Sequence, residues 1–169
     1  MRRKINDVIS DLNVFVGGKE FLGVCPSFKI PDITQVMVEH NGALKGKVGS
    51  GIYEPLEITF KLNELDFGVY TDFALNNTKA HIPLAMRESI HKQGTGDLPL
   101  AVELLGEFES LAINEDSVGT VREITLKVWA DVFTLKQNGK PLIIYDRLNN
   151  EMWFGGVDMM SQIRKNLEL

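Results

Sequence analysis

The stretch TVREITLKVWADVFTLKQNGKPLIIYDRL, residues 120–148, decides the fold class of this 169-residue chain. Apolar and polar residues alternate over much of the part before Asn138-Gly139, and a second strand pattern, residues 141–148, follows this pair. Because successive residues of a strand point to opposite faces, this alternation is typical of half-buried β-strands. An Asn-Gly pair between two such runs predicts a type I′ hairpin turn. The run before the turn, residues 120–137, is long for one strand, so we expect a bulge or bend around residues 128–131.

Similar alternation extends the β pattern over most of the chain. The expected strands cover residues 12–16, 21–28, 33–40, 52–62, 80–91, 98–113 and 141–148. Gly17-Gly18 separates the first two as a hairpin turn. No linker, internal repeat or low-complexity tract divides the sequence. It therefore predicts one mainly β domain of the α+β class, spanning residues 1–169.

Two short helices complete the predicted domain. The first is capped by Asp66 and has apolar residues at helical spacing, namely Phe67, Tyr70 and Ala74. The second follows Asp158 near the end of the chain. Its apolar stripe consists of Met160, Ile163 and Leu167. Such a stripe is more often core than partner surface, but its terminal position leaves a contact with another subunit open.

Residues 41–51, NGALKGKVGSG, contain four glycines. The segment is too long for a tight turn and too rich in glycine for a helix, so we expect an extended loop that is mobile or ordered by a partner. A phosphate-binding loop would need Gly-x-x-x-x-Gly-Lys followed by Ser or Thr. Here Gly42 and Gly46 are one residue too close, and Val48 follows Lys47. The spacing excludes that interpretation.

Composition limits the partners and the compartment. The formal net charge is −5 and the pI is near 5.2, which argues against tight binding to a phosphate backbone. The single cysteine, Cys25, can form no intrachain disulfide and is expected to be a small buried residue. No apolar run is long enough for a signal peptide or for the ~20 residues of a membrane span. We therefore expect a protein that is made and kept in the cytoplasm or leaves the cell by a route other than ordinary secretion, without membrane binding by the subunit itself.

The residues that could carry catalysis or hold a metal do not form a recognisable site. The histidines are His40, His81 and His91. They have no cysteine partners and no i, i+4 pairing, so surface or hydrogen-bonded histidines are expected. No serine lies in a Gly-x-Ser-x-Gly turn, and Cys25 has no triad signature around it. The sequence predicts neither an enzyme nor a bound cofactor or metal.

Five segments, taken in order, resemble the major tail tube proteins of contractile-tailed phages and R-type tailocins. They are LNVFVGGKEFLGV (residues 12–24), the Pro31 region with the strand and Gly-rich loop that follow, the strand 56–62 leading into a helix, KQNGK (136–140), and Gly156-Val157-Asp158 with Arg164, Asn166, Leu167 and Leu169 after it. No single motif is specific. Their order and spacing over nearly the whole chain carry the resemblance.

The resemblance implies a β-sandwich or barrel-like core with one flanking helix and a short C-terminal helix. In that family, rings of six copies stack into a tube inside a contractile sheath, and the tube is the conduit for DNA in a phage or the penetrating needle of a tailocin. The implied partners are further copies of the chain, the sheath protein, the baseplate or tube-initiator protein and the tail terminator, with DNA passing through unbound. The implied location is the tail of a virion assembled in the cytoplasm of a bacterial host.

The resemblance also assigns a role to the Gly-rich loop, which in this family extends toward a neighbouring ring. The expected inter-subunit residues are Asn41, Gly42, Leu44, Lys45, Gly46, Lys47, Gly49 and Gly51. We expect the loop to be disordered in an isolated subunit and ordered by a neighbour in the tube.

Glu103, Glu107 and Glu109 share one face of a predicted strand. Carboxylates in this arrangement are common on solvated sheets, and no aromatic sugar platform accompanies them, so a glycosidase pair is not indicated. A conduit should repel the phosphate backbone, since lumenal Lys or Arg would bind it. We therefore expect these carboxylates to line the lumen, with Glu57 as a weaker candidate.

Two other functions fit the sequence. One is a ring or tube protein of a type VI secretion or related contractile injection system, which would carry effector proteins instead of DNA. The other is a monomeric β-barrel that binds a small ligand. Electron microscopy separates the three functions: stacked tubes support the tail tube, isolated short rings support the secretion system, and no assembly supports the ligand binder.

Overall fold

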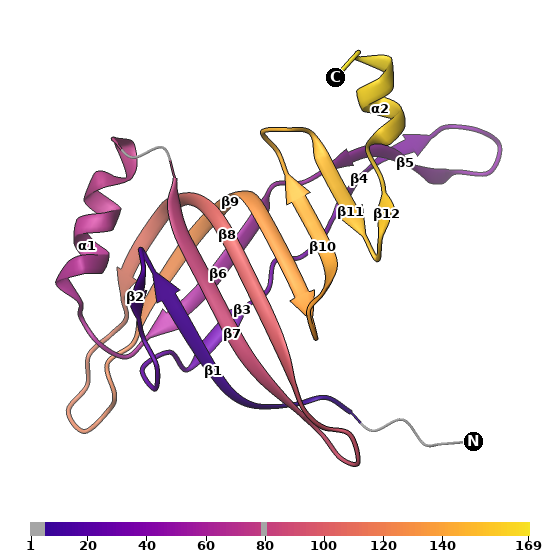
Figure 1. Cartoon of the computed structure of the whole chain (residues 1–169). Coiled ribbons are helices and arrows are strands. Elements are labelled where there is room, and N and C mark those ends of the chain that lie inside the picture. Colours follow the sequence, from indigo (N-terminus) through magenta and orange to yellow (C-terminus); the bar gives the residue numbers. More distant parts are fainter. Residues whose placement is uncertain (1–5, 79–80) are drawn as a thin grey trace.

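The computed structural model of the chain describes residues 6–78 and 81–169 (Figure 1). The strands of this part are β1 (Val8–Val16), β2 (Lys19–Glu20), β3 (Ser27–Lys29), β4 (Gln35–His40), β5 (Gly46–Tyr53), β6 (Leu56–Leu62), β7 (Ile82–Lys92), β8 (Gly96–Ile113), β9 (Ile124–Gln137), β10 (Lys140–Asp146), β11 (Glu151–Phe154) and β12 (Val157–Asp158). The helices are α1 (Phe67–Ala74), the 3-10 helix η1 (Leu75–Asn77) and α2 (Ser161–Asn166). The predicted mainly β chain with two short α-helices is confirmed.

One curved antiparallel sheet makes up the body of the molecule. Its strands follow the order β12-β11-β10-β9-β8-β7-β1-β2, and β6, which also pairs with β3, joins it at β9. The sheet bends around a single core, with α1 on one side (Figure 1). Strands β4 and β5 form a separate two-stranded sheet.

The long strand β9 is the branch point of this sheet. It pairs with β8 along its whole length, and on its other side it pairs first with β6 and then with β10. The change of partner falls at Asp131, because Ala130 is the last residue of β9 paired with β6 and Val132 is the first paired with β10. Asp131 is also the extra residue of a β-bulge, since Leu105 lies opposite Val132 whereas Gly106 lies opposite Ala130. The bulge predicted around residues 128–131 is confirmed.

The bulge explains a glycine and a buried charge. A Cβ atom on Gly106 would lie 2.2 Å from the carbonyl oxygen of Trp129, so only glycine fits there without movement of the backbone. The bulge shifts the alternation by one residue, which buries Asp131 next to Ala130. The Asp131 carboxylate accepts a hydrogen bond from Nε of Arg147 at 2.8 Å, and His81 Nδ1 lies 2.9 Å from its other oxygen.

The core consists of the residues that the alternation places on one face. In β6, for example, the buried residues are Leu56, Ile58, Phe60 and Leu62. Their counterparts in the neighbouring strands include Val14, Met86, Val102, Leu126 and Phe133. These positions confirm that the alternating strands have one buried face, and burying them supplies the main driving force for folding.

The turns also follow the sequence. Asn138 and Gly139 have φ angles of 49° and 77°, as a type I′ turn requires, and they join β9 to β10. Gly17 and Gly18 likewise have positive φ angles of 57° and 87° and join β1 to β2. Both predicted hairpin turns are confirmed, but the strand expected over residues 21–28 is wrong, because β1 pairs with β2 at Lys19–Glu20 and the chain then leaves the strand until β3.

Helix α1 forms where it was predicted but faces differently. The Asp66 side chain accepts a hydrogen bond from the Val69 N–H at 3.1 Å, so the predicted cap is confirmed. The buried side chain is Val69, and Phe73 packs on Phe108 with ring centroids 6.1 Å apart. Phe67, expected on the apolar face, is 88% exposed. The spacing of Phe67, Tyr70 and Ala74 does not identify the buried face of α1. This short helix has apolar residues on two faces, and the face with Val69 and Phe73 packs on the body.

Candidate assembly surfaces

The Gly-rich segment is part of a β-hairpin. Strands β4 and β5 pair with Val38 opposite Val48 and Glu39 opposite Lys47. Only residues 41–45 form the turn between them. The expected loop over residues 41–51 is therefore wrong from Gly46 onward, because β5 begins there. Of the expected contact residues, Asn41, Gly42, Leu44 and Lys45 lie in the turn, and Gly46, Lys47, Gly49 and Gly51 lie in β5.

The sequence did not show this pairing because glycines are poor strand formers. In the structure, a Cβ atom on Gly49 would lie 2.6 Å from the side-chain oxygen of Gln35, so a larger residue there requires the Gln35 side chain to move. The Ser50 hydroxyl donates to the Val36 carbonyl at 2.7 Å and adds a cross-strand bond. β5 is thus a strand in which the glycines hide the alternation of apolar and polar residues that usually indicates a strand.

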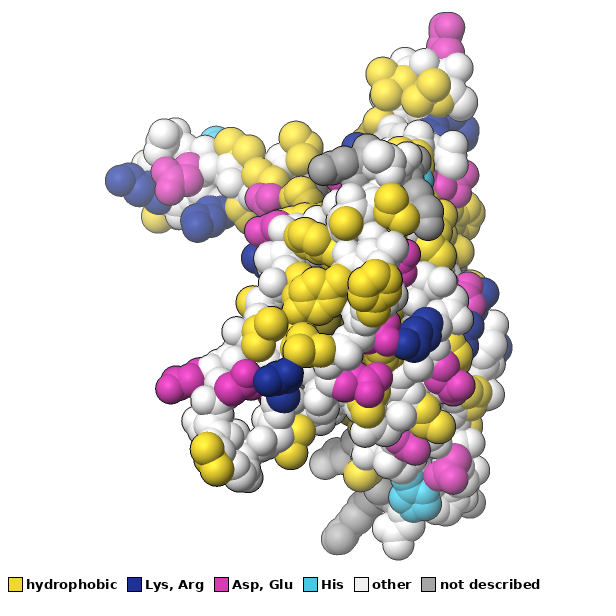
Figure 2. Space-filling view, turned by 90° about the vertical axis from the view of Figure 1, so that its left-hand side faces the viewer, with side chains coloured by type: hydrophobic (Ala, Val, Ile, Leu, Met, Phe, Trp, Pro, Cys, Tyr) yellow, Lys and Arg dark blue, Asp and Glu magenta, His cyan; other side chains and the backbone are white. Residues whose placement is uncertain are grey.

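This hairpin stands away from the body of the molecule in two perpendicular views (Figures 1 and 2). Val38 and Val48 are 55% and 57% exposed, and Leu44 at the tip is 89% exposed. An isolated two-stranded hairpin is at best marginally stable in water. Its exposed aliphatic side chains therefore make it a candidate contact surface.

The four predicted lumen residues lie together on the face of the sheet that points away from the core. Glu103, Glu107 and Glu109 are exposed side chains of β8, and Glu57 is partly exposed on β6. Glu57 and Glu107 are both directly opposite Trp129 of β9. The sequence grouping of these carboxylates therefore corresponds to one continuous surface, which we call the outer sheet face.

Basic residues from neighbouring strands accompany these carboxylates. Lys127 Nζ lies 3.2 Å from a Glu57 oxygen and 3.7 Å from a Glu109 oxygen. The hydrogen bond to Glu57 is the main reason that the pKa of Lys127 is raised. The outer sheet face is thus mixed in charge, not one-sidedly acidic. Lys127 belongs to β9, and its position beside β8 could not be predicted from the sequence of either strand alone.

Glu103 is paired in the same way at the other end of this face. Arg87 donates to it from β7 at 2.7 Å, and Lys136 Nζ of β9 lies 3.9 Å from its second oxygen. Among the residues that the structure describes, Glu107 has no Lys or Arg nitrogen within 4.0 Å. Carboxylates therefore neutralise the cations of this face and leave it slightly negative.

The C-terminal helix is not part of the core. No residue of α2 is buried, and Ile163 and Leu167 are 39% and 59% exposed. Asp158 anchors the helix: its carboxylate accepts the Met160 N–H at 2.9 Å and pairs with Arg164. Of the two interpretations of the apolar stripe, burial in the core of its own subunit is therefore wrong.

Met160 and Ile163 line a hollow of about 270 Å³ between α2 and the body. Its other walls come from the end of β5, at Gly51–Tyr53, and from β10 at Tyr145. The helix and the projecting hairpin thus meet at this hollow. The two segments that the sequence picked out separately form one end of the molecule (Figure 1).

The remaining candidate residues have structural roles. His91 Nδ1 lies 2.8 Å from Asp97, and His81 contacts Asp131, as expected of hydrogen-bonded histidines. Cys25 is buried, and burial raises the pKa of its thiol to about 11. Within residues 6–78 and 81–169, no three His, Cys, Asp or Glu side chains are placed to hold a metal ion. None of the described helices is long and apolar enough to cross a membrane.

Known proteins resemble this chain over nearly its whole length. The family described as "Phage tail tube protein FII" matches residues 6–167. The tail tube protein of Escherichia phage P2 is 27% identical over 167 residues, covering 94% of this chain and 95% of the phage protein.

The fold likewise resembles chains from an extracellular contractile injection system. A chain of the PVC sheath/tube terminator has a TM-score of 0.55 at 13% identity, covering 80% of this chain and 99% of its own length. A chain of the PVC sheath-tube complex has a TM-score of 0.51 at 14% identity, covering 75% and 88%. These two likenesses concern the fold, whereas the family match spans the sequence. The chain belongs to the phage tail tube protein FII family.

Proposed function

We propose that copies of this protein close into rings of six and that the rings stack into the inner tube of a contractile tail. The observation that carries the proposal is the family match from residue 6 to residue 167. The protein acts in this proposal as a structural element without catalysis. Its partners are further copies of itself, the surrounding sheath, and the baseplate and terminator proteins that end the tube.

The open edges of the sheet support ring closure. The sheet ends at β2 and β12, and its branch ends at β3. Each of these strands leaves one side unpaired in the described structure, and unpaired edges favour association with another chain. A closed ring uses every such edge in the same way and leaves none free to aggregate. The projecting β4–β5 hairpin then remains for contact along the tube axis.

The outer sheet face supports a lumenal position. A DNA duplex moves freely past a wall only if its phosphates find no available cation, because each Lys or Arg contact releases counterions and adds affinity. Lys127 and Arg87 are held by Glu57 and Glu103, so a phosphate would have to displace a carboxylate to reach them. Glu107 adds an unneutralised charge beside them. A face of this kind repels the backbone weakly and binds it nowhere.

A tube of an injection system that carries proteins is the second candidate, favoured by the likeness to the PVC chains. Identities of 13–14% there support a common fold only, whereas the P2 protein is related over the whole sequence. We therefore favour the phage or phage-derived tail.

Electron microscopy of the purified protein tests the proposal. Concentrated protein should form straight hollow tubes of stacked rings, and sedimentation should show growth with concentration. A protein that stays monomeric under all conditions, in the presence of its sheath and baseplate proteins as well, contradicts it. Particles isolated from the source cells then decide the cargo, since only an intact phage has DNA-filled heads attached to its tails.

A further inference from the structure

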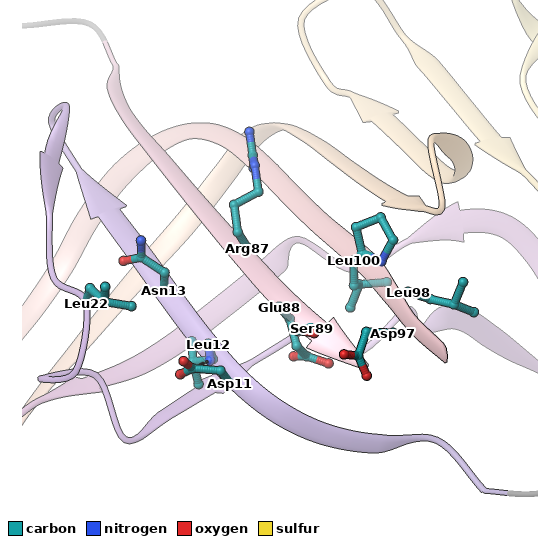
Figure 3. Close-up of a pocket in the computed structure, with 11 residues that line it drawn as sticks. Asp11, Leu12, Asn13, Leu22, Arg87, Glu88, Ser89, Asp97, Leu98 and Leu100 are labelled. Carbon is teal, nitrogen blue, oxygen red and sulfur yellow. Dashed lines mark hydrogen bonds between the residues drawn. The ribbon is translucent and has the colours of Figure 1, made fainter. Parts of the chain in front are cut away.

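A groove opens in the sheet at the end that lies opposite the projecting hairpin. It has a volume of about 390 Å³ and lies between β1 and the start of β8, beside the β7–β8 turn (Figure 3). Its apolar wall consists of Leu12, Leu22, Leu98 and Leu100. Leu22 is 58% exposed in the subunit. The groove is thus a second apolar surface that the described chain leaves uncovered.

One carboxylate lies within this apolar groove. Glu88 of β7 shares the core-facing side of the sheet with Leu12, which is its direct partner in β1. Among the described residues it has no hydrogen-bond or ion-pair partner. Burial raises the pKa of Glu88. A half-buried carboxylate without a partner is stabilised by a nearby cation, and the apolar groove around it favours a cation that lies beside apolar side chains.

The other charges around the groove do not supply that cation. Arg87 points away from the leucines and binds Glu103 on the opposite face of the sheet (Figure 3). Asp97 is paired with His91, and the Asp11 carboxylate accepts a hydrogen bond from its neighbouring N–H at 2.8 Å. The groove therefore presents aliphatic walls with a negative potential, which suits an aliphatic side chain next to a lysine or arginine.

The tip of the β4–β5 hairpin offers that combination. Leu44 is 89% exposed, and the exposed Lys45 follows it directly. Lys47, the next cation, instead lies opposite Glu39 in the pairing of the two strands. Lys45 is thus the hairpin cation that no carboxylate faces across the strands.

The positions of the two surfaces determine how they can meet. The hairpin leaves the molecule near α2, and the groove lies at the far end, near the β7–β8 turn (Figure 1). A subunit cannot fill its own groove with its own tip. Two different complementary patches at opposite ends generate a head-to-tail, repeating contact.

We propose that the hairpin tip of one copy enters the groove of the next copy along the tube, with Leu44 among the leucines and Lys45 against Glu88. The proposal rests on the tube function above and assigns the residues of its axial contact. It commits to a second copy of this chain because the charge and the apolar surface of the tip both complement the groove.

A charge exchange between the two sites tests the contact. Lys45→Glu and Glu88→Lys should each raise the protein concentration needed for tube formation by about tenfold or more, because each places two like charges in a partly desolvated site. The double variant K45E/E88K restores the pair and should return this concentration to near the wild-type value. The matched control is K47E/E88K, which changes the same charges on the same hairpin and should not restore assembly. Circular dichroism of each variant shows whether the subunit is folded.

Two results would overturn the proposal: single variants that assemble like the wild type, or a double variant as poor as the singles. Restoration of E88K by Lys4→Glu would also overturn it, because the groove would then take the chain's own N-terminal segment.

A cross-linking measurement separates this contact from the tube function. The variant K45C/E88C should form a ladder of head-to-tail disulfide-linked oligomers on mild oxidation, and K29C/E88C should not. The native Cys25 can stay in place because it is buried. A wild-type chain that never forms tubes contradicts the proposed function, while the ladder still reports on the contact. Absence of the ladder contradicts the contact, even where tubes form.

Discussion

Nε of Arg147 donates to the carboxylate of Asp131 at 2.8 Å, at the point where β9 exchanges β6 for β10 as its partner. The backbone repeats the link, since the Arg147 N–H donates to the Asp131 carbonyl at 2.9 Å. The branch of the sheet is therefore held by the only charged side chain that is buried in the described residues. The arm that carries β10–β12 and α2 depends on this link.

Replacing Arg147 by Ala should lower the free energy of unfolding by roughly 1–3 kcal/mol, because Asp131 is left buried with His81 as its remaining partner. Urea denaturation of the subunit measures the change. Arg122→Ala is the matched control, since Arg122 and Asp116 form a solvent-exposed pair whose loss should have a much smaller effect. Equal costs for the two variants would contradict a special role for the branch.

Gly106→Ala should be among the most damaging single-methyl additions. The new Cβ would lie 2.2 Å from the Trp129 carbonyl oxygen, an atom of the backbone that cannot rotate away. We expect a loss of roughly 2 kcal/mol or more from this overpacking. Gly46→Ala is the control, because a Cβ there meets nothing within 4 Å. A thermal melt of both isolated subunits compares them, and similar melting temperatures would show that the bulge tolerates the methyl.

The cap of α1 gives a pH-dependent prediction. The hydrogen bond from Lys19, together with the Val69 N–H, lowers the pKa of Asp66 below its value of 3.8 in an unfolded chain. A lowered pKa in the folded state means that stabilisation is complete above the unfolded value and is lost as the pH falls through the folded value. Asp66→Ala should therefore cost about 1 kcal/mol near neutral pH. The difference from the wild type should shrink below pH ~4. Urea unfolding at a series of pH values measures it, and a difference that grows in acid would contradict the assignment.

The hairpin should exchange its amide hydrogens rapidly in the free subunit and slowly in the tube. Val38→Asp, on its apolar cross-strand pair with Val48, should prevent assembly while leaving the subunit folded. Glu39→Gln, on the other face of the same strand, should assemble normally. Hydrogen exchange by mass spectrometry over residues 35–53 checks the first expectation. Equally slow exchange in subunit and tube would show that no partner orders the hairpin.

The sequence predicted those parts of the fold that depend on local signals. The alternation in β6 identified its buried face, Asn138-Gly139 identified the hairpin between β9 and β10, and Asp66 identified the start of α1. The bulge at Asp131 could be expected from the length of the strand. The change of partner there could not, because it depends on the pairing of β9 with strands far away in the sequence.

The features that the sequence did not predict lack a local pattern or depend on contacts between distant segments of the chain. The glycines of β5 concealed a strand, and β11 and β12 are too short to show a pattern. Lys127 lies beside Glu109 only because β9 pairs with β8 in this register. The groove around Glu88 combines residues from β1, β7 and β8, so no single segment indicates it.

The central claim is that this subunit builds a tube whose lumen is lined by the outer sheet face. A cryo-EM reconstruction of the assembled particle tests it most directly. We predict six subunits per ring, the side chains of Glu57, Glu103, Glu107 and Glu109 on the lumenal wall, and the β4–β5 hairpin in contact with the adjacent ring. A reconstruction with that face toward the sheath, or with the protein in no tube at all, would contradict the account.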